Sequence, residues 1–198
     1  KAPADQQSWM LGEIVAALKL RDQVKMPAAW KSAYDQLMAK GSEETRQQAE
    51  YIAVKFGDQR VFSQLRKTLA DRQADLGRRR LALDSLAVGK DTELPAVLQK
   101  LIDDDSIRTA AINALGAFDN AQTPATLLAV YAKLPAEDKQ AAIAVLSARP
   151  AYVLALLDSM EQGKVPRGDL TAFSVRQISR FKDERVTKRL NQVWGALR

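Results

Sequence analysis

The side chains that could carry chemistry in this sequence are few, and the missing ones exclude whole classes of site. Cysteine and histidine are both absent from the 198 residues. A Ser-His-Asp or Cys-His nucleophile pair therefore cannot be built. A disulfide framework and a Cys-x-x-Cys-His haem attachment are excluded too, and zinc and copper lose their usual ligands. Because no set of Asp, Glu, Lys or Tyr stands out, we expect no enzymatic activity, cofactor or metal in this segment.

The clearest candidate site is a group of basic side chains near the C-terminus. It consists of two pairs in which the members are four residues apart, a spacing that puts both on one face of a helix. Such a patch suits an acidic protein surface or a phosphate backbone. The competing interpretation is a solvated face, partly paired with Asp183 and Glu184. The four candidate partner-binding residues are Arg176, Arg180, Arg185 and Arg189.

The net charge of +6 is concentrated in the same region. Residues 167–198 contain eight bases and three acids, a net charge of +5. The other 166 residues contain 22 bases and 21 acids, a net charge of +1. A continuous nucleic-acid groove needs basic residues along its whole length. We therefore expect a protein partner, or a neighbouring domain of the same chain, and nucleic acid is disfavoured.

Two short runs of charge are weaker candidates. The run 103–105 is Asp-Asp-Asp, but it lacks the glycine and the distal glutamate of a calcium loop, so we expect a solvated turn with one helix-capping aspartate. The run 78–80 is Arg-Arg-Arg at a predicted helix start, where cations oppose the helix dipole. It is interpreted either as an anion or partner site or as a cluster offset by Asp75 and Asp84.

Three tryptophans lie among apolar residues at helical spacing: Trp9, Trp30 and Trp194. A base-stacking platform would need them on an exposed basic face. The surrounding pattern instead favours packing in the core or at the ends of the structure.

The elements that must position these residues follow from a repeated apolar phrase. Its second members are 32, 29, 31 and 32 residues apart, which leaves room for two helices and two turns in each unit. A helix pair cannot bury its own apolar face, so neighbouring pairs must stack. The five copies are Tyr51-x-x-Val54, Leu83-x-x-Leu86, Ile112-x-x-Leu115, Ile143-x-x-Leu146 and Val175-x-x-Ile178.

This period predicts an all-α protein, a HEAT-like α-solenoid of about five to six helix pairs. Residues 1–41 form a divergent N-terminal helical pair or cap, and residues 42–198 form the regular array within one continuous domain. In the first pair, Ser8 is expected to cap a helix that runs to about residue 20, and Pro27 suits the first turn of the next. No apolar stretch approaches the ~20 residues of a membrane span.

Two segments carry a family resemblance. Residues 111–119 resemble the first-helix signature of short HEAT repeats. Residues 175–178 and 191–195 resemble a segment of large bacterial membrane-bound-dehydrogenase-like or haem-binding proteins, in which a β-propeller precedes a HEAT-like array and a c-type cytochrome domain follows. The resemblance implies a periplasmic or exported protein, with haem elsewhere in the parent chain. The chain starts at Lys1 and stops within a helical pattern, so we expect a piece of a longer protein.

Together these features predict a non-catalytic, monomeric scaffold or docking module that links a dehydrogenase-like propeller to a cytochrome domain. Two alternatives stay open. The first is a nucleic-acid-binding HEAT-like protein, for which DNA affinity would depend steeply on salt. The second is a free-standing adaptor for another protein or a peptide, which would bind its partner as an isolated rod.

Overall fold

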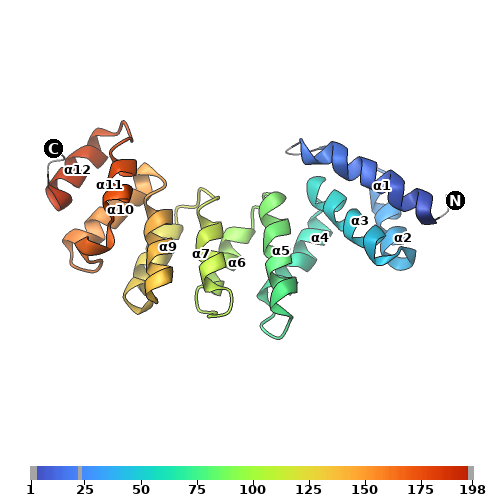
Figure 1. Cartoon of the computed structure of the whole chain (residues 1–198), viewed down its shortest axis with the longest axis horizontal. Coiled ribbons are helices and arrows are strands. Elements are labelled where there is room, and N and C mark those ends of the chain that lie inside the picture. The colour runs from blue at the N-terminus through green and yellow to red at the C-terminus, as the bar shows by residue number, and fades with distance from the viewer. Residues whose placement is uncertain (1–3, 22–23, 196–198) are drawn as a thin grey trace. The chain divides into compact units, whose positions relative to one another are not determined.

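A computed structural model describes residues 4–21 and 24–195, and over these residues the chain is helical, with no strand. The prediction of an all-α protein is confirmed. Figure 1 shows the helices in chain order. Their bounds are α1 Ala4–Lys19, α2 Trp30–Lys40, α3 Glu43–Lys55, α4 Gln59–Ala70, α5 Leu76–Val88, α6 Leu94–Leu101, α7 Arg108–Leu115, α8 Thr123–Val130, α9 Ala136–Leu146, α10 Pro150–Glu161, α11 Ala172–Ile178 and α12 Glu184–Trp194, with short 3-10 helices at Tyr131–Lys133 and Arg167–Asp169.

The chain divides into two compact units, Lys1–Leu94 and Pro95–Arg198. In the first unit, α1 and α2 both pack against α3, and α3 packs against α4 and α5. The helix α4 also packs against α5, which makes the most extensive contact in this unit. Both helices of the predicted N-terminal pair, α1 and α2, thus pack against α3, the first helix of the predicted regular array (Figure 1).

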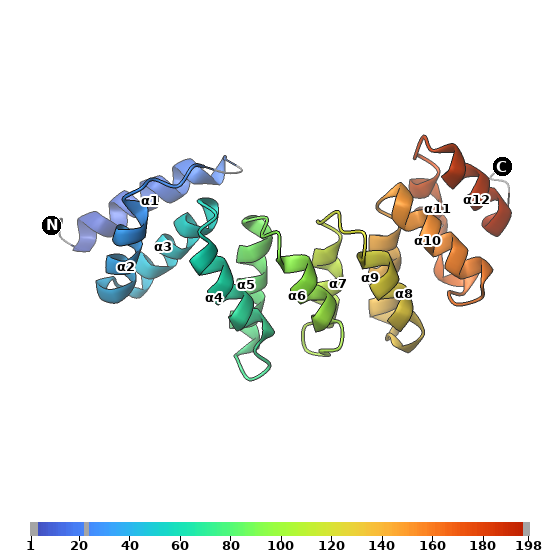
Figure 2. The same cartoon turned by 180° about the vertical axis from the view of Figure 1, so that it is seen from behind.

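The second unit has a pairing pattern typical of stacked helix pairs. Its first helices meet, because α7 packs against α9, and its second helices meet, because α10 packs against both α8 and α12. Figure 2 shows α8 and α10 next to one another on this side. The contact of α9 with α10 then joins the first helices to the second helices.

The apolar phrase supplies much of the core of both units. Nine of its ten side chains are buried, and Tyr51 is half-buried. Small residues four positions before the second phrase member are also buried, and a small side chain there allows close helix approach. These are Ala82, Ala111, Ala142 and Ser174.

Side-chain caps define the starts of several helices. The predicted cap at Ser42 is confirmed, because its Oγ accepts a hydrogen bond from the Thr45 N–H at 3.2 Å. Thr171 caps α11 in the same way through the Ser174 N–H. These bonds satisfy N–H groups that have no partner inside the helix.

Two predicted helix starts in the first unit are wrong. The first helix begins at Ala4, so Ser8 lies inside it rather than at its cap. The second begins at Trp30, because Pro27 lies in a preceding turn in which its carbonyl accepts from the Trp30 N–H at 3.0 Å. Pro27 therefore starts a turn, not a helix.

The prediction that the tryptophans pack in the core is confirmed for one residue of three. Trp30 is buried and meets the ring of Phe56 edge-on, with the ring centroids 5.1 Å apart. Trp9 is 66% exposed and Trp194 is 38% exposed, so neither lies in the core. The helix α1 buries Leu11 instead. Trp9 lies two residues earlier, which is more than half a turn around the helix, so it faces the other side. Trp9 and Trp194 lie in α1 and α12, the first and last helices of the described residues, so packing at the ends of the structure stays open for both.

Candidate functional site

Two of the four candidate arginines, Arg185 and Arg189, are held in ion pairs. Both oxygens of Asp183 bind Arg185, at 3.2 Å to Nε and 2.7 Å to Nη2. Arg189 of α12 reaches back to α10, where it contacts Asp158 and Glu161. The predicted pairing with Asp183 is thus present, and Arg189 joins neighbouring helices rather than facing a partner.

The other two arginines are exposed and free of ion pairs with any described residue. Arg176 lies in α11, and Arg180 lies two residues beyond the end of that helix. The predicted common helix for these two is wrong because the Phe181 N–H bonds to the Ile178 carbonyl and turns the chain. Phe173 is 63% exposed and lies three residues before Arg176 in α11, so these two side chains share a face of that helix.

A groove of about 560 Å³ lies beside these residues, between the end of α9 and α11. We call it the C-terminal groove. No acidic side chain lines it, and Arg180 stands at its edge with two aromatic rings, so it is an apolar hollow with a cationic rim. Its lining residues are Ala144, Ser147, Ala148, Phe173, Gln177, Arg180 and Phe181.

A second groove, in the first unit, has the opposite charge. It holds about 550 Å³ between α3 and α5, and we call it the N-terminal groove. Most of its lining is apolar, with three acids and one base at its sides. Its lining residues are Met38, Glu43, Arg46, Gln47, Glu50, Tyr51, Val54, Leu81, Asp84, Ser85 and Val88.

The apolar side chains of the N-terminal groove include two that a core would normally hide. Leu81 is 61% exposed and Val88 is 47% exposed, and their separation of seven residues puts both on one face of α5. Half-buried Glu50 faces the groove from α3. Burial raises the pKa of its carboxyl, and the nearby Glu43 raises it further. Within the described residues, Glu50 forms no ion pair.

Sequence reasoning missed the N-terminal groove, although a signal was present. The helix α5 carries its phrase residues at 83 and 86, and both are buried. Leu81 and Val88 lie off that buried stripe, so their apolar character serves no core position. Apolar residues on the opposite face of an amphipathic helix indicate a surface that another molecule covers.

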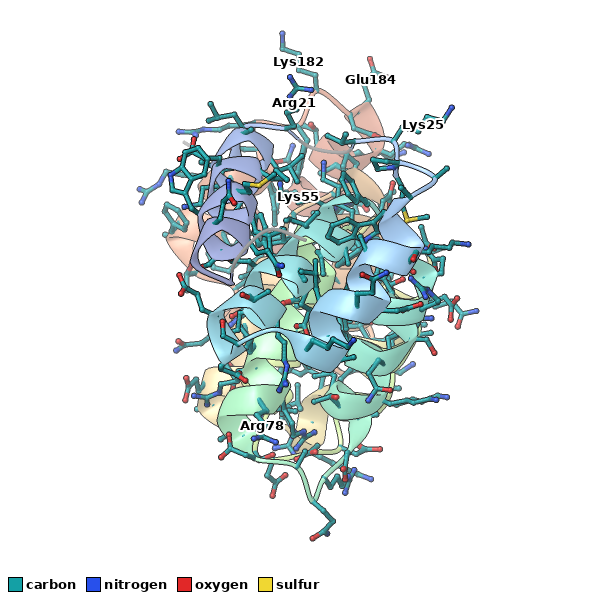
Figure 3. All side chains as sticks on the ribbon, turned by 90° about the vertical axis from the view of Figure 1, so that its right-hand side faces the viewer. Arg21, Lys25, Lys55, Arg78, Lys182 and Glu184 are labelled. Atoms are coloured by element: carbon teal, nitrogen blue, oxygen red, sulfur yellow. The ribbon has the colours of Figure 1, made fainter. Side chains whose placement is uncertain are left out.

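A third hollow in the first unit is basic, and its central lysine has a structural role. It holds about 410 Å³ and is lined in part by Lys25, Lys55 and Lys90. Lys55 is 8% exposed, and its Nζ donates to the Arg21 carbonyl at 2.9 Å (Figure 3). This bond ties the end of α3 to the segment after α1.

Each of the two charge runs contains a buried side chain with a structural role, while Arg78 and Arg80 are exposed. Arg79 is buried, and its Nε donates to the Leu69 carbonyl at 3.0 Å. The Asp75 carboxylate caps the helix through the Arg78 N–H, while Asp84 lines the N-terminal groove and forms no ion pair with a described residue.

Asp104 lies in a turn and accepts from the Ser106 N–H and hydroxyl. The predicted solvated turn with a helix-capping aspartate is wrong in two respects, because Asp104 is buried and the N-cap of α7 is Ile107, which forms no side-chain cap bond. Among the described residues, no acidic cluster could hold a metal ion.

Protonation of Asp183 in acid should remove its stabilising bonds at the start of α12, and the variant Asp183→Asn tests this. The Asp183 carboxylate accepts from the Arg185 and Val186 N–H groups, and its bond to the Arg185 guanidinium lowers its pKa to about 2. A lowered folded-state pKa gives stability that is present above about pH 4 and is lost as the pH falls through about 2. Asp183→Asn should therefore lower the urea midpoint at pH 6, and this difference should shrink at pH 2.5. A difference that stays constant with pH would contradict this assignment.

Comparisons with protein-family models, with curated proteins and with solved structures find no match to this chain. Over the described residues, none of the helices has the length and apolar character needed to cross a bilayer.

Proposed function

We propose that this chain is a non-catalytic docking module, built as a HEAT-like α-solenoid of five to six stacked helix pairs, that holds an acidic protein surface at its C-terminal groove. The observation that carries the proposal is that exposed Phe173 lies near Arg176 and Arg180, which form no ion pair with a described residue. An exposed aromatic anchor beside free cations is typical of a protein interface.

The stacked arrangement is supported by contacts within each unit. Among the first helices, α3 packs against α5 and α7 against α9, and among the second helices α10 packs against α8 and α12. The resemblance of residues 175–178 and 191–195 suggests the setting, in which the acidic partner is a c-type cytochrome domain near a dehydrogenase-like propeller in an exported protein. A nucleic-acid partner is less well supported because Arg185 and Arg189 are already paired with carboxylates.

The test is binding of an acidic c-type cytochrome to the immobilised chain at several salt concentrations. Arg176→Ala together with Arg180→Ala should weaken binding about five- to thirtyfold at low salt, because two exposed charge pairs are lost. Phe173→Ala should also weaken binding, but with little change in salt dependence. The matched control is Arg185→Ala, which removes an arginine that is held by Asp183 and should leave binding unchanged.

Two results would contradict the proposal. One is cytochrome binding that Arg176→Ala and Arg180→Ala leave unaltered at every salt concentration. The other is tight binding to duplex DNA that falls steeply with salt and is lost in the same double variant, because it would favour the nucleic-acid alternative.

A further inference from the structure

The N-terminal groove has the features of a second docking site, distinct from the C-terminal groove in unit, charge and shape. Its α3 residues fall at positions 43, 46, 47, 50, 51 and 54, and its α5 residues at 81, 84, 85 and 88. Both sets follow the three- and four-residue spacing of a single helix face. The groove is therefore bounded by two helical ridges that run for about 16 Å on the α3 side, or three turns.

The charges at its sides select a cationic ligand. Glu43, Glu50 and Asp84 line it against a single base, Arg46. Glu50, Asp84 and Arg46 form no ion pair with any residue in the described part of the chain. Glu50 is half-buried, so its carboxylate is partly desolvated and lacks a compensating cation among the described residues. The raised pKa of Glu50 reflects this surrounding.

The shape of the groove selects a helix over an extended strand. Its walls are α-helices, whose backbone groups are already bonded within each helix, so they cannot add a strand to a sheet edge. A ligand that enters must satisfy its own backbone hydrogen bonds. An amphipathic helix does so, and it can lay an apolar face on Leu81 and Val88 while its flanking lysines or arginines meet the acids.

We propose that the N-terminal groove binds a basic amphipathic helix of a partner protein, about three turns long, with apolar residues facing Leu81 and Val88 and cations facing Glu43, Glu50 and Asp84. The chain as a whole carries a net charge of +6. Overall charge therefore repels such a ligand, and its binding would have to come from this local surface. Two grooves of opposite charge would let the module hold two different partners.

The test uses the full chain and a fluorescent peptide of about 14 residues, long enough to span the groove, with leucines on one helical face and lysines on the other. Fluorescence anisotropy should give a micromolar Kd. A peptide with the same composition in scrambled order should bind at least tenfold more weakly, and so should a peptide with glutamate in place of lysine. Absence of lysine-peptide binding in the millimolar range would overturn the proposal.

Variants then locate the site. Leu81→Glu with Val88→Glu should weaken peptide binding at least tenfold while the helical circular dichroism stays unchanged, because both side chains are exposed. Glu43→Lys with Asp84→Lys should reverse the preference, so that the glutamate peptide binds better than the lysine peptide. Phe173→Glu in the other groove is the matched control and should leave peptide binding unchanged.

Other outcomes would overturn the proposal. If Leu81→Glu with Val88→Glu leaves peptide affinity unaltered, the peptide binds elsewhere. If the wild-type chain sediments as a dimer that the same double variant converts to a monomer, and added peptide does not dissociate that dimer, the groove is occupied by a second copy. Neither result bears on the acidic-partner site, which is tested by variants of Phe173, Arg176 and Arg180.

Discussion

Leu115→Ala is expected to lower the free energy of unfolding by about 3 kcal/mol, and the melting temperature by about 6–12 °C. Leu115 ends α7 and is 0% exposed, so its removal leaves a cavity where α7 packs against α9. Removal of buried side-chain atoms costs their transfer free energy and the unfilled space together. Thermal unfolding followed by circular dichroism measures the change.

The control for this prediction is the same chemical change at a surface position. Leu20 is 94% exposed, so Leu20→Ala should alter the free energy of unfolding by less than about 0.5 kcal/mol. Equal effects at the two positions would show that the apolar phrase does not form the core.

Arg66→Ala is expected to cost about 3–5 kcal/mol, because it strands a buried carboxylate. Asp91 is 1% exposed, and both of its oxygens accept from Arg66 Nη1, at 2.7 and 2.8 Å. This pair joins α4 to the loop that follows α5. The loss should appear as a lower denaturant midpoint, measured with urea.

A second substitution shows how much of the stability loss comes from the unpaired Asp91 carboxylate and how much from lost packing of Arg66. Asp91→Asn in the Arg66→Ala background removes the buried negative charge and should recover part of the lost stability. No recovery would mean that Arg66 stabilises the fold through its contacts and not through its charge. The exposed ion pair between Arg185 and Asp183 is the comparison. Arg185→Ala should lower the urea midpoint much less than Arg66→Ala does.

The sequence predicts the helical fold and the central part of the core because the apolar phrase marks the buried face of the first helix in each pair. Leu86, Leu115, Leu146 and Ile178 are all 0% exposed, as the period requires. Stacking of all the pairs into one solenoid stays a prediction. A periodic pattern identifies the face of a helix that is covered, but it leaves open which distant element covers it.

Prediction of the candidate site was less successful, for reasons of geometry. Proximity in the sequence indicates Asp183 as a partner of Arg185, but a spacing of four residues cannot show that Arg189 pairs with Glu161 instead of facing solvent. The pair of Arg189 with Glu161 spans 28 residues along the chain. Grooves are harder still, because the N-terminal groove exists only where side chains from α3 and α5 come together. A local sequence pattern does not show which residues of α3 and α5 come close in space.

Several polar contacts between elements join residues that are about 30 positions apart in the sequence. Thr109 binds Asp138 over 29 residues, the Tyr152 hydroxyl donates to the Asn120 carbonyl over 32, and Arg189 binds Asp158 over 31. Each contact closes a loop of about one helix pair, so the entropy lost on closure is small. During synthesis, a helix pair can therefore begin to settle as soon as the next one has left the ribosome, without waiting for the distant C-terminus.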